Sequence, residues 1–341
     1  MRKMATIRKI DAVTAIPNAD AIELAHVGGW RVVIKKGEFA ARDLAVYCEI
    51  DSWLPYELAP FLSKGSEPRE YMGIKGERLR TIKLRGQVSQ GLLLPRYAVL
   101  DIVGEIYEGM DVTEILGIVK YDPPVPAHLA GEVRGTFPSW IKKTDQERVQ
   151  NLTQKITEWV AQGLSWEVTE KLDGSSMTVY IHNGDEGVCS RNLDLKETET
   201  NSYWMVARRE GLLDKIRSTG RNLALQGELI GEGIQGNPYK IKGQDFRLFD
   251  IYDIGNSQYL APWEREAMAS RLGIKTVPVI EWTVKLLDTL GIATVEQMLV
   301  FAEGKSKLLD SVEREGLVFK CHEQAVSFKA ISNRFLLKNG D

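Results

Sequence analysis

The chain has 341 residues, with 44 Lys and Arg against 47 Asp and Glu, which gives a formal net charge of −3. Hydrophobic residues make up 43% and charged residues 27%, ordinary values that exclude a disordered tail protein, a collagen-like rod and a disulfide scaffold. The length predicts about two domains, and the near-neutral charge by itself argues against a nucleic-acid partner.

The cysteines and the N-terminus bear on the compartment. Cys48, Cys189 and Cys321 have no Cys-x-x-Cys spacing, and no stretch approaches the ~18 apolar residues of a spanning helix. The N-terminus is basic, but charged residues interrupt any apolar run, which argues against a secretory signal. We therefore expect a cytoplasmic or other intracellular protein with no membrane association and no Cys-based zinc site.

The first 120 residues are expected to be rich in strands. Short apolar runs at Trp30–Ile34, Leu44–Ile50 and Gly91–Leu94 are separated by Gly, Pro and Asp, a pattern typical of a small barrel or sandwich. Prolines at positions 123, 124 and 126, with Pro138 just beyond, then disfavour regular structure. This proline segment is the expected domain boundary.

Beyond the prolines, the sequence predicts both helices and strands. The spacing of Val149, Leu152, Ile156 and Trp159 predicts a helix over Asp145–Val160. Further strands are expected at Trp166–Thr169, Ser176–Ile181, Arg247–Tyr252, Gly316–Lys320 and Ala325–Lys329, and helices at Ser202–Arg217, Trp263–Leu272 and Val295–Ala302.

The most informative peptide is Glu-Lys-Leu-Asp-Gly-Ser-Ser at Glu170–Ser176, at a predicted turn between two strands. Taken alone, it is better explained as the turn of a β-hairpin, because Asp-Gly is a common turn pair. Five more peptides follow it in the chain, at Cys189–Asn192, Gln226–Gly231, Phe246–Tyr252, Glu313–Lys320 and Ser327–Ser332.

In order, these six peptides resemble motifs I, Ia, III, IIIa, IV and V of the covalent nucleotidyltransferases, which include ATP-dependent DNA and RNA ligases and mRNA capping enzymes. The resemblance spans about half the chain. It implies that Lys171 takes AMP from ATP. The other implied catalytic residues are Asp173, Glu228, Glu315 and Lys329, and the implied nucleotide-binding residues are Glu170, Lys171, Ser176, Arg191, Asn192, Glu228, Phe249 and Lys329.

The residue types suit this chemistry independently of the family. A lysine amine can take AMP from ATP as a phosphoramidate, but with an ordinary pKa of ~10.4 it must first lose a proton. The carboxylates of Asp173, Glu228 and Glu315 could hold Mg²⁺ or Mn²⁺, largely through water. Such a cation would favour the deprotonated form of Lys171.

The remaining candidates would bind the nucleotide. Lys329 and Arg191 would neutralise charge on phosphate oxygens. Phe249 could stack on adenine, and Ser176 or Asn192 could meet ribose hydroxyls.

Each candidate also has a simpler explanation. Singly, Glu228 and Glu315 are ordinary surface charges, Phe249 is core and Arg191 is a surface cation; only the joint pattern favours a site. The sequence also departs from the family at motif V, where RNA ligases often carry a second lysine and this chain has Ile331. Lys320 or Lys338 would have to supply that charge.

The N-terminal region and the short C-terminus indicate a branch of the superfamily. Ile16–Leu24 and Lys83–Leu92 resemble an OB fold of the tRNA-binding type. The chain ends 12 residues after Lys329, so we expect no trailing OB domain of the kind found in DNA ligases and capping enzymes. The arrangement is similar to the fifth clade of RNA ligases, known from Deinococcus and Naegleria.

This resemblance implies an α+β protein. It predicts an N-terminal OB-type β-barrel that binds nucleic acid (residues 1–120), a linker (121–145) and a nucleotidyltransferase domain (146–341) with two antiparallel sheets and flanking helices. The peptide Phe137–Arg148 looks like the segment that precedes this ligase core, which would place Arg148 near the ATP phosphates or the RNA. The other interpretation is a helix-surface arginine beside an N-cap at Asp145.

Local charge modifies the inference from net charge. Residues 1–120 carry a net charge of +1 and residues 121–341 a net charge of −4, whereas Lys75–Arg85 alone carries +4. On one strand, Arg78 and Arg80 would share a face and Lys83 and Arg85 the other. Such a strand suits a phosphate backbone, although an edge strand protected by charge has the same composition.

The sequence thus predicts an ATP-dependent RNA ligase that acts in RNA repair. It would seal 3′-OH/5′-phosphate nicks in duplex RNA or RNA/DNA hybrids through lysyl-AMP and an adenylylated 5′-phosphate, with no obligate protein partner. Such enzymes prefer ribonucleotides at the 3′-OH end. The alternatives are a DNA ligase, a GTP-dependent capping enzyme, and a non-catalytic RNA-binding protein with a ligase-like fold.

Overall fold

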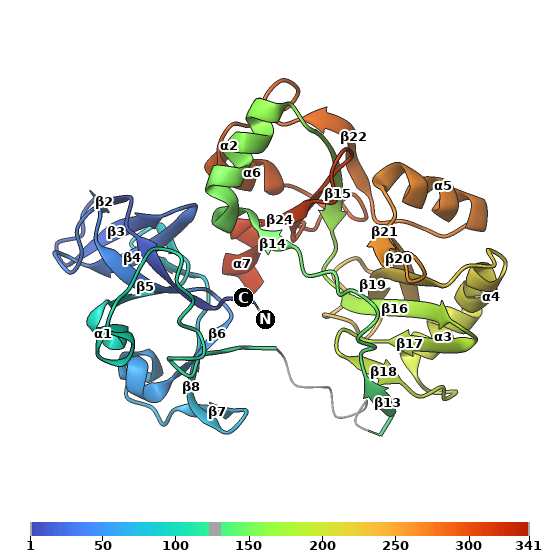
Figure 1. The fold of residues 1–341 in the computed structure, drawn as a ribbon, viewed down its shortest axis with the longest axis horizontal. Coiled ribbons are helices and arrows are strands. Elements are labelled where there is room, and N and C mark those ends of the chain that lie inside the picture. The colour runs from blue at the N-terminus through green and yellow to red at the C-terminus, as the bar shows by residue number, and fades with distance from the viewer. Residues whose placement is uncertain (1, 123–130, 340–341) are drawn as a thin grey trace. The chain divides into compact units, whose positions relative to one another are not determined.

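The computed structural model describes residues 2–122 and 131–339. The chain forms two compact units (Figure 1): unit 1 comprises Met1–Pro124, Gln150–Thr153 and Leu336–Asp341, and unit 2 comprises Val125–Val149 and Gln154–Phe335. The prolines at 123, 124 and 126, where the boundary was expected, lie outside the described residues.

Unit 1 consists mainly of short antiparallel strands. In chain order they are β1 (Ala5–Lys9), β2 (Ala12–Ala15), β3 (Ile22–Val27), β4 (Trp30–Lys35), β5 (Leu44–Cys48), β6 (Ser52–Pro55), β7 (Arg69–Tyr71), β8 (Ile74–Arg78), β9 (Ile82–Leu84), β10 (Gln87–Ser89), β11 (Leu92–Pro95) and β12 (Val119–Lys120). They pair in the orders β1-β5-β11, β2-β3-β4, β12-β6-β8-β7 and β10-β9. Helix α1 (Tyr97–Val103) and 3₁₀ turns at Tyr56–Leu58 and Pro60–Ser63 complete the unit.

The basic segment of unit 1 is not one strand, and this prediction was wrong. Strand β8 ends at Arg78, and β9 and β10 form a separate hairpin. Its two turn residues, Arg85 and Gly86, have φ values of 47° and 83°, as in the type I′ turns that suit the twist of a hairpin. Lys83 and Arg85 are exposed.

Unit 2 contains two sheets. Its strands are β13 (Val133–Thr136), β14 (Glu147–Arg148), β15 (Ser165–Lys171), β16 (Ser175–His182), β17 (Asp185–Cys189), β18 (Leu193–Leu195), β19 (Leu223–Gly231), β20 (Gln244–Asp253), β21 (Gln258–Tyr259), β22 (Val279–Lys285), β23 (Gly316–Cys321) and β24 (Ser327–Ile331). One sheet has the order β13-β18-β17-β16-β19-β20-β21 and the other β14-β24-β23-β15-β22. The pairs are antiparallel except β14 with β24, which is parallel.

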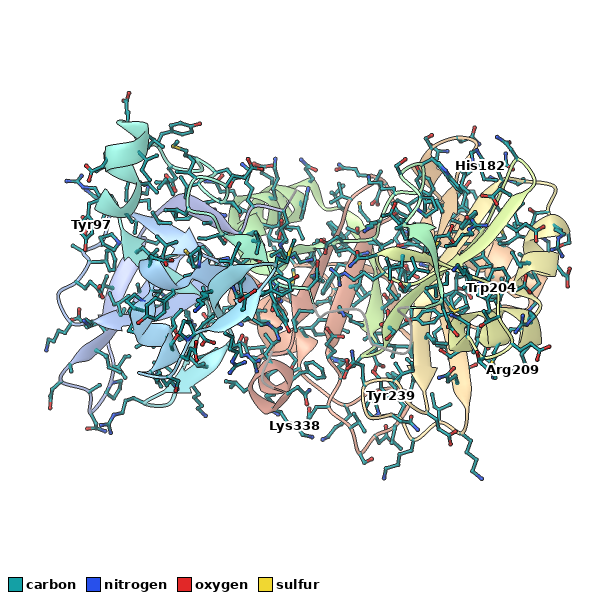
Figure 2. All side chains as sticks on the ribbon, turned by 90° about the horizontal axis from the view of Figure 1, so that it is seen from below. Tyr97, His182, Trp204, Arg209, Tyr239 and Lys338 are labelled. Carbon is teal, nitrogen blue, oxygen red and sulfur yellow. The ribbon has the colours of Figure 1, made fainter. Side chains whose placement is uncertain are left out.

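Helices cover these sheets. They are α2 (Thr153–Gln162), α3 (Ser202–Arg209), α4 (Leu212–Arg217), α5 (Pro262–Leu272) and α6 (Val295–Ala302). A last helix, α7 (Asn333–Asn339), follows β24, and its residues from Leu336 onward are grouped with unit 1. Helices α3, α4 and α5 bury apolar residues, Trp204 of α3 among them, against one face of the seven-stranded sheet (Figure 2). On the five-stranded sheet, Trp159 of α2 stacks on Phe328 of β24, with ring centroids 5.6 Å apart.

The predicted α+β class, with a strand-rich unit before a unit of two sheets and helices, is confirmed. The helix predicted over Asp145–Val160 is wrong at its start, because Glu147–Arg148 pairs with β24 and a 3₁₀ turn at Val149–Leu152 precedes α2. The helix predicted over Ser202–Arg217 is divided, because Gly211 has a φ of 62°. The last strand starts at Ser327, two residues late.

Candidate active site

Lys171 is the last residue of β15, and its ammonium is paired with Glu315, which directly precedes β23. Lys171 lies opposite Gly316 in the register of β15 with β23, and Lys171 Nζ is 2.6 Å from Glu315 Oε2. A Cβ on Gly316 would lie 2.3 Å from the carbonyl oxygen of Ala330, so this close strand pairing requires glycine. The sheet thus joins two residues that are 144 positions apart.

The turn between β15 and β16 places Asp173 beside the strand that carries Glu228. The backbone N–H of Asp173 donates to the hydroxyl of Tyr239 at 2.7 Å. A Cβ on Gly174 would lie 2.5 Å from the carbonyl oxygen of Leu229. Glycine is therefore needed for the turn to approach β19 this closely.

Glu228 completes a cluster of three carboxylates. Its pKa is raised to about 8, chiefly by burial and further by Glu315 and Asp173, while Lys171 and Arg191 act in the opposite direction. These mutual effects show that the side chains share one electrostatic environment.

The same cluster keeps Lys171 protonated. Burial lowers the pKa of Lys171, but Glu315, Glu228 and Asp173 together raise it above its ordinary value. An ammonium cannot act as a nucleophile, so Lys171 needs additional positive charge nearby before it can attack.

The three carboxylates fit a divalent cation held through water. Burial is the main cause of the raised pKa of Glu228, and the negative charges of Glu315 and Asp173 raise it further. A bound cation would offset that negative charge. Within residues 2–122 and 131–339, no group of three or more His, Cys, Asp or Glu side chains is arranged to hold a metal ion, so these carboxylates would bind a cation largely through water. Mg²⁺ commonly keeps several waters and takes only one or two protein carboxylates directly.

Lys329 and Arg148 lie on the same face of the five-stranded sheet as Lys171. Lys329 lies opposite Val318 in β23, two residues from Gly316, which itself lies opposite Lys171. Alternate residues of a strand share a face. Arg148 lies opposite Lys329 in the parallel pair of β14 with β24, and its side chain is buried. Arg148 is therefore a strand residue, not the helix-surface arginine of the alternative interpretation.

Arg191 and Asn192 lie in the exposed turn between β17 and β18. The charge of Arg191 lowers the pKa of Glu228, so its guanidinium acts on the cluster. Asn192 is held by the segment before β14: Lys143 Nζ donates to Asn192 Oδ1 at 2.9 Å, and the N–H of Phe137 donates to its carbonyl at 2.9 Å. Ser176 is half-buried and lies opposite Glu228 in the register of β16 with β19.

Phe249 is the extra residue of a β-bulge. The register of β19 with β20 shifts between Gln226 and Gly227, and Phe249 has no opposite residue there. Bulges redirect side chains, and this ring packs against a cluster that includes Leu172 and Tyr239. It therefore lies next to the turn that follows β15.

Glu170 and Lys338 lie elsewhere, whereas Lys320, two residues after Val318 in β23, shares the sheet face of Lys171 and Lys329. Glu170 alternates with Lys171, so it faces the opposite side of β15, where its buried carboxylate accepts from the N–H of Lys307 at 2.7 Å. Lys320 is bound to Asp250, with Lys320 Nζ 2.7 Å from Asp250 Oδ1. Lys338 lies on α7, in the segment grouped with unit 1.

Sequence reasoning did not find the residues that hold the candidates in place. Tyr239 contacts Asp173 from a loop 66 residues away, and Lys143 contacts Asn192 across 49 residues. The alternative interpretation made Asp145 a helix N-cap, but its Oδ1 lies 3.5 Å from Lys329 Nζ. These contacts form only in the folded chain, and no local sequence pattern predicts them.

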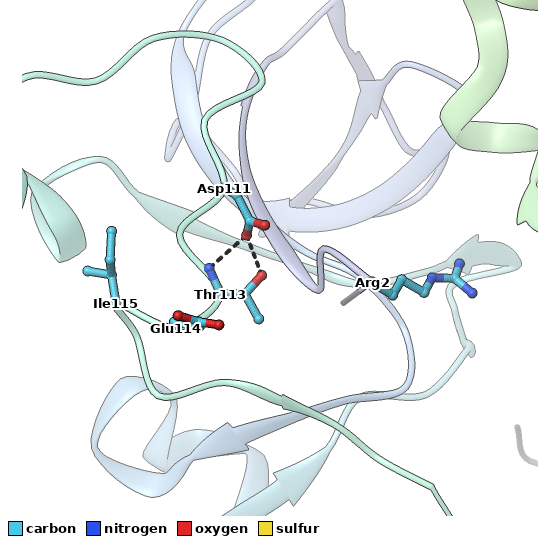
Figure 3. Close-up of a pocket in the computed structure, with 5 residues that line it drawn as sticks. All are labelled: Arg2, Asp111, Thr113, Glu114 and Ile115. Atoms are coloured by element: carbon cyan, nitrogen blue, oxygen red, sulfur yellow. Dashed lines mark hydrogen bonds between the residues drawn. The ribbon is translucent and has the colours of Figure 1, made fainter. Parts of the chain in front are cut away.

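Unit 1 contains a separate pocket lined by Arg2, Asp111, Thr113, Glu114 and Ile115 (Figure 3). Asp111 Oδ1 accepts from the N–H and the hydroxyl of Thr113, at 3.0 and 2.6 Å, so local partners already use that carboxylate oxygen. Within the part of the chain that the structure describes, no helix is both long and apolar enough to cross a membrane.

Comparison with known proteins identifies similar chains. A family model described as RNA ligase matches residues 164–338, and a model of an OB-fold domain matches residues 4–96. A search of curated proteins gave no significant match.

Several solved structures are similar over nearly the whole chain. A glutamate-to-alanine variant of Naegleria gruberi RNA ligase with AMP and Mn is 50% identical, with a TM-score of 0.91, over 99% of this chain and 100% of that one. A lysine-to-alanine variant of the same enzyme with ATP and Mn is 50% identical, with a TM-score of 0.90, over 99% and 100%. The enzyme with PPi is 50% identical, with a TM-score of 0.89, over 98% of each chain.

Proposed function

Because the chain belongs to the RNA ligase family, we propose that this ATP-dependent RNA ligase seals 3′-OH/5′-phosphate nicks in duplexes through a covalent lysyl-AMP. The observation that carries the proposal is the position of Lys171. Its Nζ lies 2.6 Å from Glu315, within a cluster of three carboxylates and on a sheet face shared with Lys329.

The chain uses ATP and a divalent metal, as its relatives do: structures of the Naegleria gruberi enzyme contain ATP or AMP together with Mn. Asp173, Glu228 and Glu315 would hold Mg²⁺ or Mn²⁺ largely through water. When bound, the cation supplies positive charge that polarises the α-phosphate and favours the neutral amine of Lys171.

In the first step Lys171 transfers AMP to itself. Once Nζ has given its proton to solvent, its lone pair attacks the α-phosphorus of ATP, the N–P bond forms, and the bond to the bridging oxygen breaks so that pyrophosphate leaves. Lys329, Arg148 and Arg191 would neutralise charge on the phosphate oxygens. Phe249 would stack on the adenine, and Ser176 or Asn192 would meet the ribose.

In the second step an oxygen of the RNA 5′-phosphate attacks the phosphorus of lysyl-AMP, and Lys171 leaves and takes up a proton. In the third step the 3′-OH loses its proton, attacks the activated 5′-phosphate, and AMP leaves as the phosphodiester forms. Each step exchanges one bond at phosphorus, so positioning and charge neutralisation supply most of the catalysis.

The hairpin of β9 and β10 supports a role for unit 1 in holding the RNA. Lys83 and Arg85 are exposed on it, and Ile82 and Leu84 are exposed apolar residues of the same strand. Cations of this kind bind a phosphate backbone without reading its sequence.

Replacing the two hairpin cations should weaken RNA binding. In a Lys83→Ala/Arg85→Ala variant we expect the slope of log Kd against log salt to fall by ~2, about one unit for each lost phosphate contact. Titration of nicked duplex RNA at several salt concentrations measures this slope. Lys36→Ala/Arg42→Ala is a matched control, because it removes one exposed Lys and one exposed Arg from the same unit. An unchanged slope in the hairpin variant would remove unit 1 cations from the RNA-binding proposal.

The 3′-OH nucleotide tests the nick specificity. Two duplexes that differ only in ribose or deoxyribose at the 3′-OH end should be sealed at different rates, with the ribose nick faster. An A-form duplex with its 2′-hydroxyls offers contacts that DNA lacks. Single-turnover sealing of the two nicks measures the ratio, and equal or faster sealing of the deoxyribose nick would favour a DNA ligase.

A further inference from the structure

The bulge at Phe249 leaves its carbonyl oxygen available to buried cations. In a regular ladder this oxygen would accept from the neighbouring strand, but Phe249 has no opposite residue in β19. Instead, its oxygen accepts from Lys320 Nζ and, at 3.4 Å, from Arg265 Nη1. Two cations from different elements therefore converge on the backbone of this residue.

Arg265 lies on α5, outside the six motifs, and is 1% exposed. Its guanidinium forms two hydrogen bonds with Glu167 of β15, which is 0% exposed: Nη1 to Oε2 at 2.9 Å and Nη2 to Oε1 at 2.5 Å. A two-pronged pair of this kind fixes the plane of the guanidinium as well as its position.

A second ion pair joins the same cluster. Lys320 Nζ is 2.7 Å from Asp250 Oδ1, and Asp250 follows Phe249 in β20. Lys320 lies opposite Glu167 in the register of β15 with β23. The two ion pairs thus connect β15, β23, β20 and α5 at the β-bulge formed by Phe249.

A buried ion pair of this kind contributes little net stability, because the cost of desolvation offsets most of the attraction. Replacing such a pair with apolar residues of similar size is often neutral or stabilising. What apolar residues would not supply is the second donor to the carbonyl of Phe249, beside Lys320 Nζ. The pair of Arg265 with Glu167 is therefore better explained by the position it gives to Phe249 than by stability.

We propose that Arg265, oriented by Glu167, is a positioning residue that fixes the Phe249 bulge and so sets the ring for the base of ATP. The inference rests on the proposed function, in which Phe249 stacks on adenine. Arg265 touches neither nucleotide nor RNA in this account; it acts through Phe249.

The test measures the ATP concentration that gives half-maximal lysyl-AMP labelling, with the full chain and labelled ATP. In a Glu167→Leu/Arg265→Met variant, which removes both charges and keeps the side-chain volume, we expect this concentration to rise by about tenfold, equivalent to ~1.4 kcal/mol of lost binding. The maximal rate should change much less. Arg265→Lys should also raise the half-maximal ATP concentration, because a single ammonium lacks the branched guanidinium that reaches both Glu167 and the carbonyl of Phe249.

Three comparisons separate the outcomes. Arg271→Met, an exposed position on the same helix, should leave the half-maximal ATP concentration unchanged. A lower unfolding temperature with unchanged ATP dependence in the double variant would overturn the inference, because Arg265 would then be only structural. If the double variant does not fold, an unchanged ATP dependence of a folded Arg265→Lys variant overturns it.

Phe249→Ala distinguishes this inference from the proposed function. If Phe249→Ala raises the half-maximal ATP concentration and the Arg265 variants do not, only the inference fails. If Phe249→Ala has no effect, the assignment of Phe249 to adenine fails, and the inference falls with it.

Discussion

Replacing Lys171 with methionine should abolish the joining of a 5′-phosphate nick in the presence of ATP. Methionine keeps much of the side-chain volume but has no amine, so no phosphoramidate can form. Loss of a covalent nucleophile lowers the rate by on the order of 10⁶-fold. Sealing of a labelled nicked duplex, followed over hours with excess enzyme, measures the loss.

A second substrate shows whether the loss is chemical. When the nick already carries an adenylylated 5′-phosphate, the 3′-OH attacks and AMP leaves, and no bond to Lys171 forms. The Lys171→Met variant should therefore largely retain this reaction if the rest of the site is intact. Sealing of the ordinary nick by the variant at a rate near that of the unmodified protein would exclude the lysyl-AMP pathway.

Replacing Glu315 with glutamine should lower lysyl-AMP formation by about 10²–10³-fold, the range observed when one fixed electrostatic group of an active site is removed. Two effects oppose each other. The change removes one carboxylate that would hold the cation, which slows the reaction. It also removes the partner 2.6 Å from Lys171 Nζ, which lowers the pKa of that amine and increases its neutral fraction.

The loss of the cation-binding carboxylate should outweigh the gain in neutral Lys171. A lower pKa increases the neutral fraction only while the pH lies below the pKa of the amine, whereas the missing carboxylate weakens cation binding at every pH. The direction in which the pH dependence shifts gives a second readout. The neutral amine is the reactive form, so the residual activity of Glu315→Gln should reach half its plateau at a lower pH than that of the unmodified protein. It should also need more Mn²⁺ for half-maximal rate.

Glu313→Gln is the matched control, since Glu313 lies two residues before Glu315 and pairs with Lys305 instead, 2.5 Å away. Its labelling rate and Mn²⁺ dependence should match those of the unmodified protein. Equal effects of the two substitutions would indicate damage to the loop before β23. Glu315 would then have no special role.

The sequence predicts the part of the site that depends on short segments. The turn at Asp173 and Gly174 lies between two strands as expected, because a strand, an Asp-Gly pair and a second strand are all local signals. Lys171 and Glu315 come together because each lies at the end of one of two neighbouring strands. Their motif positions already implied a shared site.

Other features depend on contacts that the local sequence does not encode. Apolar spacing predicted a helix from Asp145. Instead, Glu147–Arg148 forms the edge strand β14, and its partner strand β24 lies about 180 residues later in the chain. The pattern Arg-Leu-Phe-Asp-Ile reads as a regular strand, and the bulge at Phe249 arises from its pairing with β19. Glu170 and Lys171 both belong to β15, so their side chains face opposite sides of the sheet. This follows only when the C-terminal end of β15 is known.

The most direct measurement uses ATP labelled at the α-phosphate. After incubation with Mn²⁺, the account predicts a covalently labelled protein with AMP on Lys171, located by peptide mass spectrometry. Addition of nicked duplex RNA should move the label to the 5′-phosphate and then release it as AMP as the strand is sealed. Label on another residue, label from GTP but not ATP, or label that nicked RNA does not remove would contradict it.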